Sequence, residues 1–239
     1  MARWVSRRRF LQTTGWTAAG AGLVGSAAAG AGPSETAQTD QKIKIIGIAC
    51  SPRKGKTTAQ AVQVALEASK AVAPDRIETE LIDLAELEIP GYVAAGIPLK
   101  EGQRDDFPAI AEKLADKQTA GIIVGSPVYF GNMSYLCKAF LDRCIALRMR
   151  RFALSGKVAG AVAVGGVRNG GQEMTLQAIA AALSCQEMLL VGDGKPTAHW
   201  GATVWNNGTD DITQDEFGMA TLKNLGRRVA EVALACRAK

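Results

Sequence analysis

Short apolar runs and longer segments with helical spacing follow one another along the chain. Five runs are rich in apolar, often β-branched residues and are bounded by glycine, proline or polar clusters, which predicts strands. The predicted strands cover Ile43–Ala49, Ile77–Leu84, Ala120–Gly125, Val158–Val164 and Met188–Val191.

The segments that follow these strands carry apolar residues on one helical face. In the first of them, Ala61, Val64 and Leu66 have this spacing, and Pro74 ends the helix. Proline and glycine recur over 85–107, which is therefore predicted as a long loop, as is 192–213. The predicted helices cover Thr57–Ala73, Pro108 to about Lys117, Met133–Arg148, Gln172–Cys185 and Gln214–Ala235.

Strands and helices thus alternate from residue 42 to the end of the chain. This alternation predicts the α/β class, with right-handed crossovers and a doubly wound five-stranded parallel sheet that has helices on both faces. The strands are apolar almost throughout, as expected for a sheet buried on both sides. Residues 42–239 therefore form one predicted domain.

The first 31 residues are predicted to be a twin-arginine (Tat) signal peptide. Ser6–Gln12 holds the arginine pair, a weakly apolar stretch over 13–32 follows, and Ala27–Ala29 and Ala29–Ala31 are candidate cleavage sites. Residues 32–41 are a polar linker. We expect the Tat machinery to export the protein to the periplasm or another extracytoplasmic site. An uncleaved membrane anchor is the alternative, although threonines and glycines interrupt the apolar stretch.

Charge and cysteine usage limit the partners. The chain has a formal charge of +5, but four arginines and no acids lie in the predicted signal, so the mature domain carries about +1. Without a basic stripe, nucleic-acid binding loses its main electrostatic support. The five cysteines form no C-x-x-C pair, so no zinc or iron–sulfur site is predicted and no residue is assigned as a metal ligand. A disulfide remains open.

Three loops that follow predicted strands carry the candidate chemistry. Ligands of an open parallel sheet bind at the carboxyl ends of its strands, so the three loops are expected to converge on one ligand. The loops are Cys50–Thr58, Gly125–Ser134 and Gly165–Glu173.

The first loop is suited to a phosphate group. It leads into a predicted helix, whose first N–H groups and partial positive charge favour an anion. Hydroxyl groups, one guanidinium and a glycine that permits close backbone approach strengthen this prediction. One alternative is a plain turn with Thr57 as N-cap. Another is a nucleotide-hydrolysing P-loop, but Cys50 stands where its first glycine belongs. The predicted phosphate-binding residues are Ser51, Arg53, Gly55, Thr57 and Thr58.

The second and third loops are suited to a flat ring. The second offers apolar and aromatic surface, an amide and backbone N–H groups. The alternative is that its aromatics belong to the core or to an interface. The third loop has four glycines and a cation. Together the three loops predict a flavin mononucleotide (FMN) site. The predicted ring-binding residues are Pro127, Val128, Tyr129, Phe130, Gly131 and Asn132 of the second loop and Gly166, Arg168 and Gly170 of the third.

These segments resemble the NADPH-dependent FMN reductase family of flavodoxin-like proteins, near its iron–sulfur flavoprotein branch. The resemblance covers about Lys42 to Ala235. It rests on Ser51–Thr57, on Ser126–Gly131 with Lys138, Asp142 and Arg143 in the next helix, and on Gly165–Glu173.

The resemblance implies an FMN-dependent oxidoreductase with strand order 2-1-3-4-5 and FMN between strands one and three. It further implies NADPH or NADH as electron donor, a small-molecule acceptor or redox partner, and a homodimer or homotetramer. The flavin performs the redox chemistry, and no catalytic residue is assigned.

The chain departs from this family in two ways that bear on its electron donor and electron route. Iron–sulfur flavoproteins carry a cysteine cluster after the second strand, whereas 85–107 contains no cysteine. Export would also separate the protein from nicotinamide donors. The alternative function is therefore an electron-transfer flavoprotein served by a quinol or redox protein. His199 is expected to be a loop or subunit-contact residue, since a lone histidine has no identified partner.

Overall fold

The computed structural model describes residues 42–237, so the predicted signal peptide and linker lie outside the described residues. This part of the chain forms a sheet of seven strands, whereas five were predicted. The strands are β1 (Ile43–Ala49), β2 (Ile77–Asp83), β3 (Thr119–Tyr129), β4 (Asn132–Met133), β5 (Val158–Gly165), β6 (Leu189–Leu190) and β7 (Ala202–Trp205).

The helices follow the predicted order with two corrections. The loop predicted over 85–107 contains a 3-10 helix, and the helix predicted over Met133–Arg148 is two helices that meet at Cys144. The helical elements are α2 (Thr57–Val72), η1 (Gly91–Ala95), α3 (Phe107–Ala115), α4 (Tyr135–Arg143), α5 (Ile145–Met149), α6 (Gln172–Ser184) and α7 (Glu216–Arg237).

The main sheet has the order β2-β1-β3-β5-β6. Its strands are parallel, and β5 and β6 take the fourth and fifth places of the predicted order 2-1-3-4-5. The fifth place is divided, because β6 pairs with the first residues of β5 and β7 pairs with Val162–Gly165. The prediction of a loop over 192–213 is therefore wrong at β7, where the chain returns to the sheet edge after leaving it.

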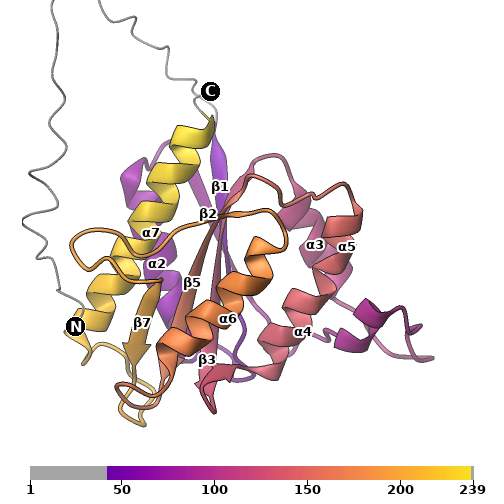
Figure 1. Cartoon of the computed structure of the whole chain (residues 1–239), viewed down its shortest axis with the longest axis horizontal. Coiled ribbons are helices and arrows are strands. Elements are labelled where there is room, and N and C mark those ends of the chain that lie inside the picture. The colour runs from indigo at the N-terminus through magenta and orange to yellow at the C-terminus, as the bar shows by residue number, and fades with distance from the viewer. Residues whose placement is uncertain (1–41, 238–239) are drawn as a thin grey trace, which may run out of the picture. The chain divides into compact units, whose positions relative to one another are not determined.

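Helices cover both faces of the sheet (Figure 1). Helices α2 and α7 lie together on one face, and α3, α4, α5 and α6 lie on the other. Successive side chains of β1 alternate between the two cores, with Ile45 on the α2–α7 side and Ile46 on the opposite side. Gly226 brings α7 close to α2, since a Cβ atom there would lie 1.9 Å from the Ala65 oxygen.

The register brings the three candidate loops to one edge of the sheet. Ala49 of β1 is paired with Gly125 of β3, and Gly125 is paired with Val162 of β5. Because these neighbouring strands are parallel, the segments that follow them emerge side by side. None of the described helices is long and apolar enough to span a membrane.

Candidate functional site

The first loop presents an uncapped helix end. Helix α2 begins at Thr57, as predicted, and its N-cap is Lys56, which offers no side-chain cap. The alternative of a plain turn with Thr57 as N-cap is therefore wrong. No acidic residue lies in the first turn. This helix end is available to an external anion, which its unpaired N–H groups and dipole would stabilise.

The predicted phosphate residues surround this helix end to different degrees. Ser51 is buried, and its Oγ accepts a hydrogen bond from Arg53 N at 3.0 Å, which shapes the turn. Gly55 N donates to Asp83 Oδ2 at 2.8 Å. Thr58 is also buried, and its methyl group points towards Gly125. Thr58 therefore packs the first turn of α2 against β3.

A fourth segment, which sequence analysis left without a role, crosses the first loop. We call residues 206–211 the strap. Asp210 Oδ1 lies 2.6 Å from Arg53 Nη1, and its Oδ2 lies 2.9 Å from Lys56 Nζ. Bonds from Lys56 and Arg53 lower the pKa of Asp210. The Asp210 carboxylate thus pairs with the two cations that a phosphate would use. The side chains of Arg53 and Lys56 can therefore converge on one anion.

The strap also connects the first loop to the third. Asn206 Nδ2 lies 3.5 Å from Thr57 Oγ1, and Asn206 N donates to Gly165 O at 3.0 Å. Gly208 N donates to Gly166 O at the same distance. The sequence signal that marks this region is the β-rich run of β7 followed by the turn-forming Asn206–Gly208.

The second loop is the tip of a hairpin between β3 and β4. Phe130 and Gly131 form its two-residue turn with φ angles of 50° and 73°, as a type I′ turn requires. Phe130 is fully exposed and Tyr129 is 45% exposed, so neither is a core aromatic. Val128 is half-buried against the core, and Asn132 Oδ1 accepts from Met133 N at 2.8 Å.

Ser134 joins the second loop to the first. Its buried Oγ donates to Cys50 O at 2.6 Å and accepts from Cys137 N at 3.0 Å, where it caps α4. Its backbone N–H donates to Ser126 Oγ at 2.9 Å. The hydroxyl group of Ser134 therefore joins the end of β1 to the start of α4, and its backbone N–H ties both to Ser126 of β3.

The third loop contacts the hairpin through glycine. Gly171 has a φ of 101°, and a Cβ atom there would lie 2.7 Å from Gly131 Cα. At Gly166 a Cβ atom would meet nothing within 4 Å, so the backbone there borders open space. Arg168 stacks over the Trp205 ring at 5.3 Å and lies 3.8 Å from Asp215. The three predicted loops are thus brought together.

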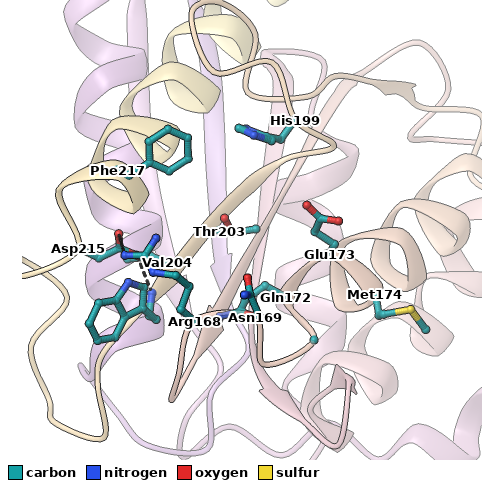
Figure 2. Close-up of a pocket in the computed structure, with 12 residues that line it drawn as sticks. Arg168, Asn169, Gln172, Glu173, Met174, His199, Thr203, Val204, Asp215 and Phe217 are labelled. Atoms are coloured by element: carbon teal, nitrogen blue, oxygen red, sulfur yellow. Dashed lines mark hydrogen bonds and ion pairs between the residues drawn. The ribbon is translucent and has the colours of Figure 1, made fainter.

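A cavity of about 420 Å³ lies on the outer side of the third loop (Figure 2). Its lining includes Arg168, Trp205 and His199, and none of its lining residues comes from the first or second loop. His199 lies in the loop between β6 and β7, as expected, and it has a partner that the sequence did not reveal: its Nδ1 lies 3.2 Å from Oδ2 of the fully buried Asp193.

Other residues singled out from the sequence have structural contacts. Arg143 makes two hydrogen bonds to Asp105, at 3.0 and 2.7 Å, and both side chains are largely buried. Lys138 and Asp142 form an exposed ion pair along α4. The cysteines are free thiols. Burial raises the pKa of Cys50 well above its usual value, so this thiol beneath the first loop stays protonated.

The described residues fit FMN on three counts. An uncapped helix end with two nearby cations is suited to its phosphate. An exposed aromatic hairpin and an open glycine backbone border the space in which a flat ring would lie. The hydroxyl clamp at Ser134 and the strap hold these parts in place.

Comparison with known proteins agrees with this geometry. The profile of the NADPH-dependent FMN reductase family matches residues 43–202. The chain belongs to this family.

Relatives of the chain include proteins named as iron-sulfur flavoproteins and as NAD(P)H dehydrogenases (quinone). It is 44% identical over 193 residues to an iron-sulfur flavoprotein of Methanocaldococcus jannaschii, covering 80% of this chain and 97% of that one. It is 32% identical over 160 residues to an NAD(P)H dehydrogenase (quinone) of Archaeoglobus fulgidus, covering 67% and 78%.

Solved structures agree on the fold. An oxidoreductase from Corynebacterium diphtheriae superposes with a TM-score of 0.61 at 18% identity, covering 82% of this chain and 98% of that one. A flavodoxin, WrbA-like protein from Agrobacterium tumefaciens has a TM-score of 0.54 at 19% identity, covering 81% and 98%. The fold is flavodoxin-like, and the protein is an FMN-dependent oxidoreductase.

Proposed function

We propose that this protein is an exported FMN oxidoreductase that takes electrons from NAD(P)H or another donor and passes them to a small-molecule acceptor through the flavin ring. The observation that carries the proposal is the convergence of the three loops at the carboxyl ends of β1, β3 and β5, in a chain of this family. When bound, FMN supplies the hydride and electron chemistry.

The protein residues would hold and orient the flavin. Arg53, Thr57 and the N–H groups of α2 bind the phosphate, for which the Asp210 carboxylate has to leave the two cations of the first loop. The Val128–Asn132 hairpin borders one side of the ring, and the third loop borders its other edge. The exposure of Tyr129 and Phe130 supports this arrangement, because their rings are free to contact a ligand or a second subunit.

Export and self-association are further parts of the proposal. The twin-arginine segment over Ser6–Gln12 supports Tat export, a route compatible with folding around FMN before translocation. A homodimer or homotetramer would cover the hairpin. Residues 85–107 contain no cysteine, so we infer that electrons do not pass through an iron–sulfur cluster in this segment. In this respect the chain differs from its relatives named as iron-sulfur flavoproteins.

The test is anaerobic spectroscopy of the purified mature domain. We expect a yellow protein whose flavin absorbance is bleached by NADPH or NADH. Bleaching by a quinol or a reduced redox protein, with both nicotinamides inert, would favour the alternative electron-transfer function. A colourless protein that cannot take up FMN would overturn both.

Export is tested separately by replacing Arg7 and Arg8 with lysine in the full chain. We expect the precursor to accumulate inside the cell, because the receptor reads the arginine pair. Undiminished export of the double variant would refute the Tat assignment.

A further inference from the structure

Basic residues gather at the edge of the sheet opposite the candidate site. This edge comprises residue 42, the last turns of helices α2, α3, α5, α6 and α7, and the connections that lead from a helix into β2, β3, β5 and β6. We call it the basic edge. Among the described residues, it holds ten cations and four acids. The cations are Lys42, Lys70, Arg76, Lys113, Lys117, Arg148, Arg150, Arg151, Lys157 and Arg237, and the acids are Asp75, Glu112, Asp116 and Glu187.

The charge of the domain is therefore divided between its two ends. Residues 42–237 have a formal charge of +2, of which the basic edge carries +6 and the remainder −4. Cations in the last turn of a helix complement the helix dipole. Lys42, Lys117 and Arg151 lie outside the helices, and these exposed side chains form no ion pair among the described residues. The basic edge thus has cations that its own acids do not neutralise.

The turn that follows α5 presents cations and apolar side chains together. Met149 is 78% exposed and Phe152 is 40% exposed, and the Arg148 guanidinium lies over the Phe152 ring at 4.7 Å. Arg151 and Phe152 have left-handed backbone, with φ angles of 56° and 54°, a costly conformation for residues with a side chain. Phe152 N donates to Arg148 O at 2.9 Å, which holds the turn. We call residues 148–152 the arginine tip.

This combination of side chains selects an anionic lipid surface. Clustered basic residues are attracted to acidic lipid headgroups. Met149 and Phe152 stand among the arginines, where apolar side chains can enter the boundary between headgroups and acyl chains. The phosphates of a nucleic acid would also attract the cations, but a duplex backbone offers no apolar surface to these two side chains.

We propose that the basic edge docks the domain on an anionic phospholipid bilayer, with the arginine tip among the headgroups. Residue 42 lies on this edge, so the polypeptide that precedes it joins the domain on the side that faces the bilayer. Figure 1 shows the start of β1 and the end of α7 at the top of the molecule and the hairpin after β3 at the bottom. The three candidate loops therefore face away from the bilayer and stay open to water-soluble partners. Docking does not depend on the proposed redox function.

Co-sedimentation of the mature protein with vesicles, with and without FMN, tests the proposal. One set of vesicles is phosphatidylcholine alone, and the other is equal parts of phosphatidylcholine and phosphatidylglycerol. Each basic residue near an anionic bilayer strengthens binding about fivefold, so the three unpaired cations predict binding on the order of 100-fold tighter to the anionic vesicles. Added salt should weaken this binding. Equal binding to the two kinds of vesicle would overturn the proposal.

Paired charge variants locate the binding surface. Lys117→Gln with Arg151→Gln removes two cations of the basic edge and should weaken binding to the anionic vesicles about 25-fold. Lys195→Gln with Lys223→Gln is the matched control, because both lysines are exposed and form no ion pair among the described residues. Lys195 O accepts from Arg227 of α7, so both lie beside the first half of this helix, roughly 15 Å or more from its end. The control should bind like the wild type, and an equal loss in both double variants would refute docking by the basic edge.

Tryptophan fluorescence reports the orientation of the docked domain. Trp200 and Trp205 flank β7, which pairs with the end of β5 that leads into the third loop. Nitroxide-labelled lipid in the anionic vesicles should therefore quench the wild-type fluorescence little. Met149→Trp places a reporter in the arginine tip, and the same lipid should quench it strongly. Equal quenching of the wild type and this variant would contradict the orientation.

Met149→Ser tests the apolar part of the arginine tip. It keeps every charge and should weaken binding to the anionic vesicles about fivefold, because the side chain loses its burial at the headgroup boundary. Circular dichroism verifies that each variant is folded. Binding to duplex DNA without sedimentation on the anionic vesicles would assign the basic edge to a nucleic acid and overturn the lipid proposal.

Discussion

Replacing Ser134 with alanine tests whether one hydroxyl clamps the first two loops together. The side chain is fully buried, caps α4 through Cys137 N and donates to Cys50 O at 2.6 Å. Loss of an N-cap costs about 1 kcal/mol. Leaving the buried Cys50 carbonyl without its donor costs about 1–2 kcal/mol more. We therefore expect Ser134→Ala to lower the free energy of unfolding by about 2–3 kcal/mol.

The assays are thermal and urea denaturation, followed by FMN titration. For a domain of this size the expected loss lowers the melting temperature by about 5–10 °C. FMN affinity should also fall, because binding then has to order loops that the clamp holds in the wild type. Ser184→Ala is the control: its exposed Oγ bonds only within its own helix, to Ala181 O. A variant within about 0.5 kcal/mol of wild type would refute the clamp. A destabilised variant with unchanged FMN affinity would show that the clamp does not order the site.

Three further changes probe the site and its supports. Gly171→Ala should destabilise the third loop by about 1–3 kcal/mol and weaken FMN binding. Gly171 has a φ of 101°, which strains a residue with a side chain, and the new Cβ would clash with Gly131. Wild-type values in denaturation and titration would contradict this contact. Asp210→Asn should tighten FMN binding and leave riboflavin binding unchanged, because it removes the negative charge that competes with the phosphate; weaker FMN binding would mean that the carboxylate orients the loop instead. Asp105→Asn should cost about 3 kcal/mol of stability, because Arg143 would lose a buried partner, and leave the bound flavin spectrum unchanged; an altered spectrum would place this pair in the flavin site.

Local patterns in the chain determined the class of fold and the convergence of the three candidate loops. Apolar β-rich runs alternating with helical segments specify strands buried on both sides and helices that cover them. The order of these elements then places the three predicted loops at one edge. Residues such as Arg53 and Gly131 are recognisable because they follow directly on a strand, so their position depends on nearby residues alone.

Contacts between distant segments were decided only by the tertiary structure. Asp210 meets Arg53 across 157 positions, and Ser134 meets Cys50 across 84, so no local spacing reports either pair. The sixth and seventh strands share one place beside β5, and neither run is long enough to reveal this by its own pattern. His199 acquires its partner in the same way, because the turn over 194–198 returns it to the buried Asp193. Periodicity is a property of neighbouring residues, whereas the strap and the clamp depend on where the completed sheet brings separate segments together.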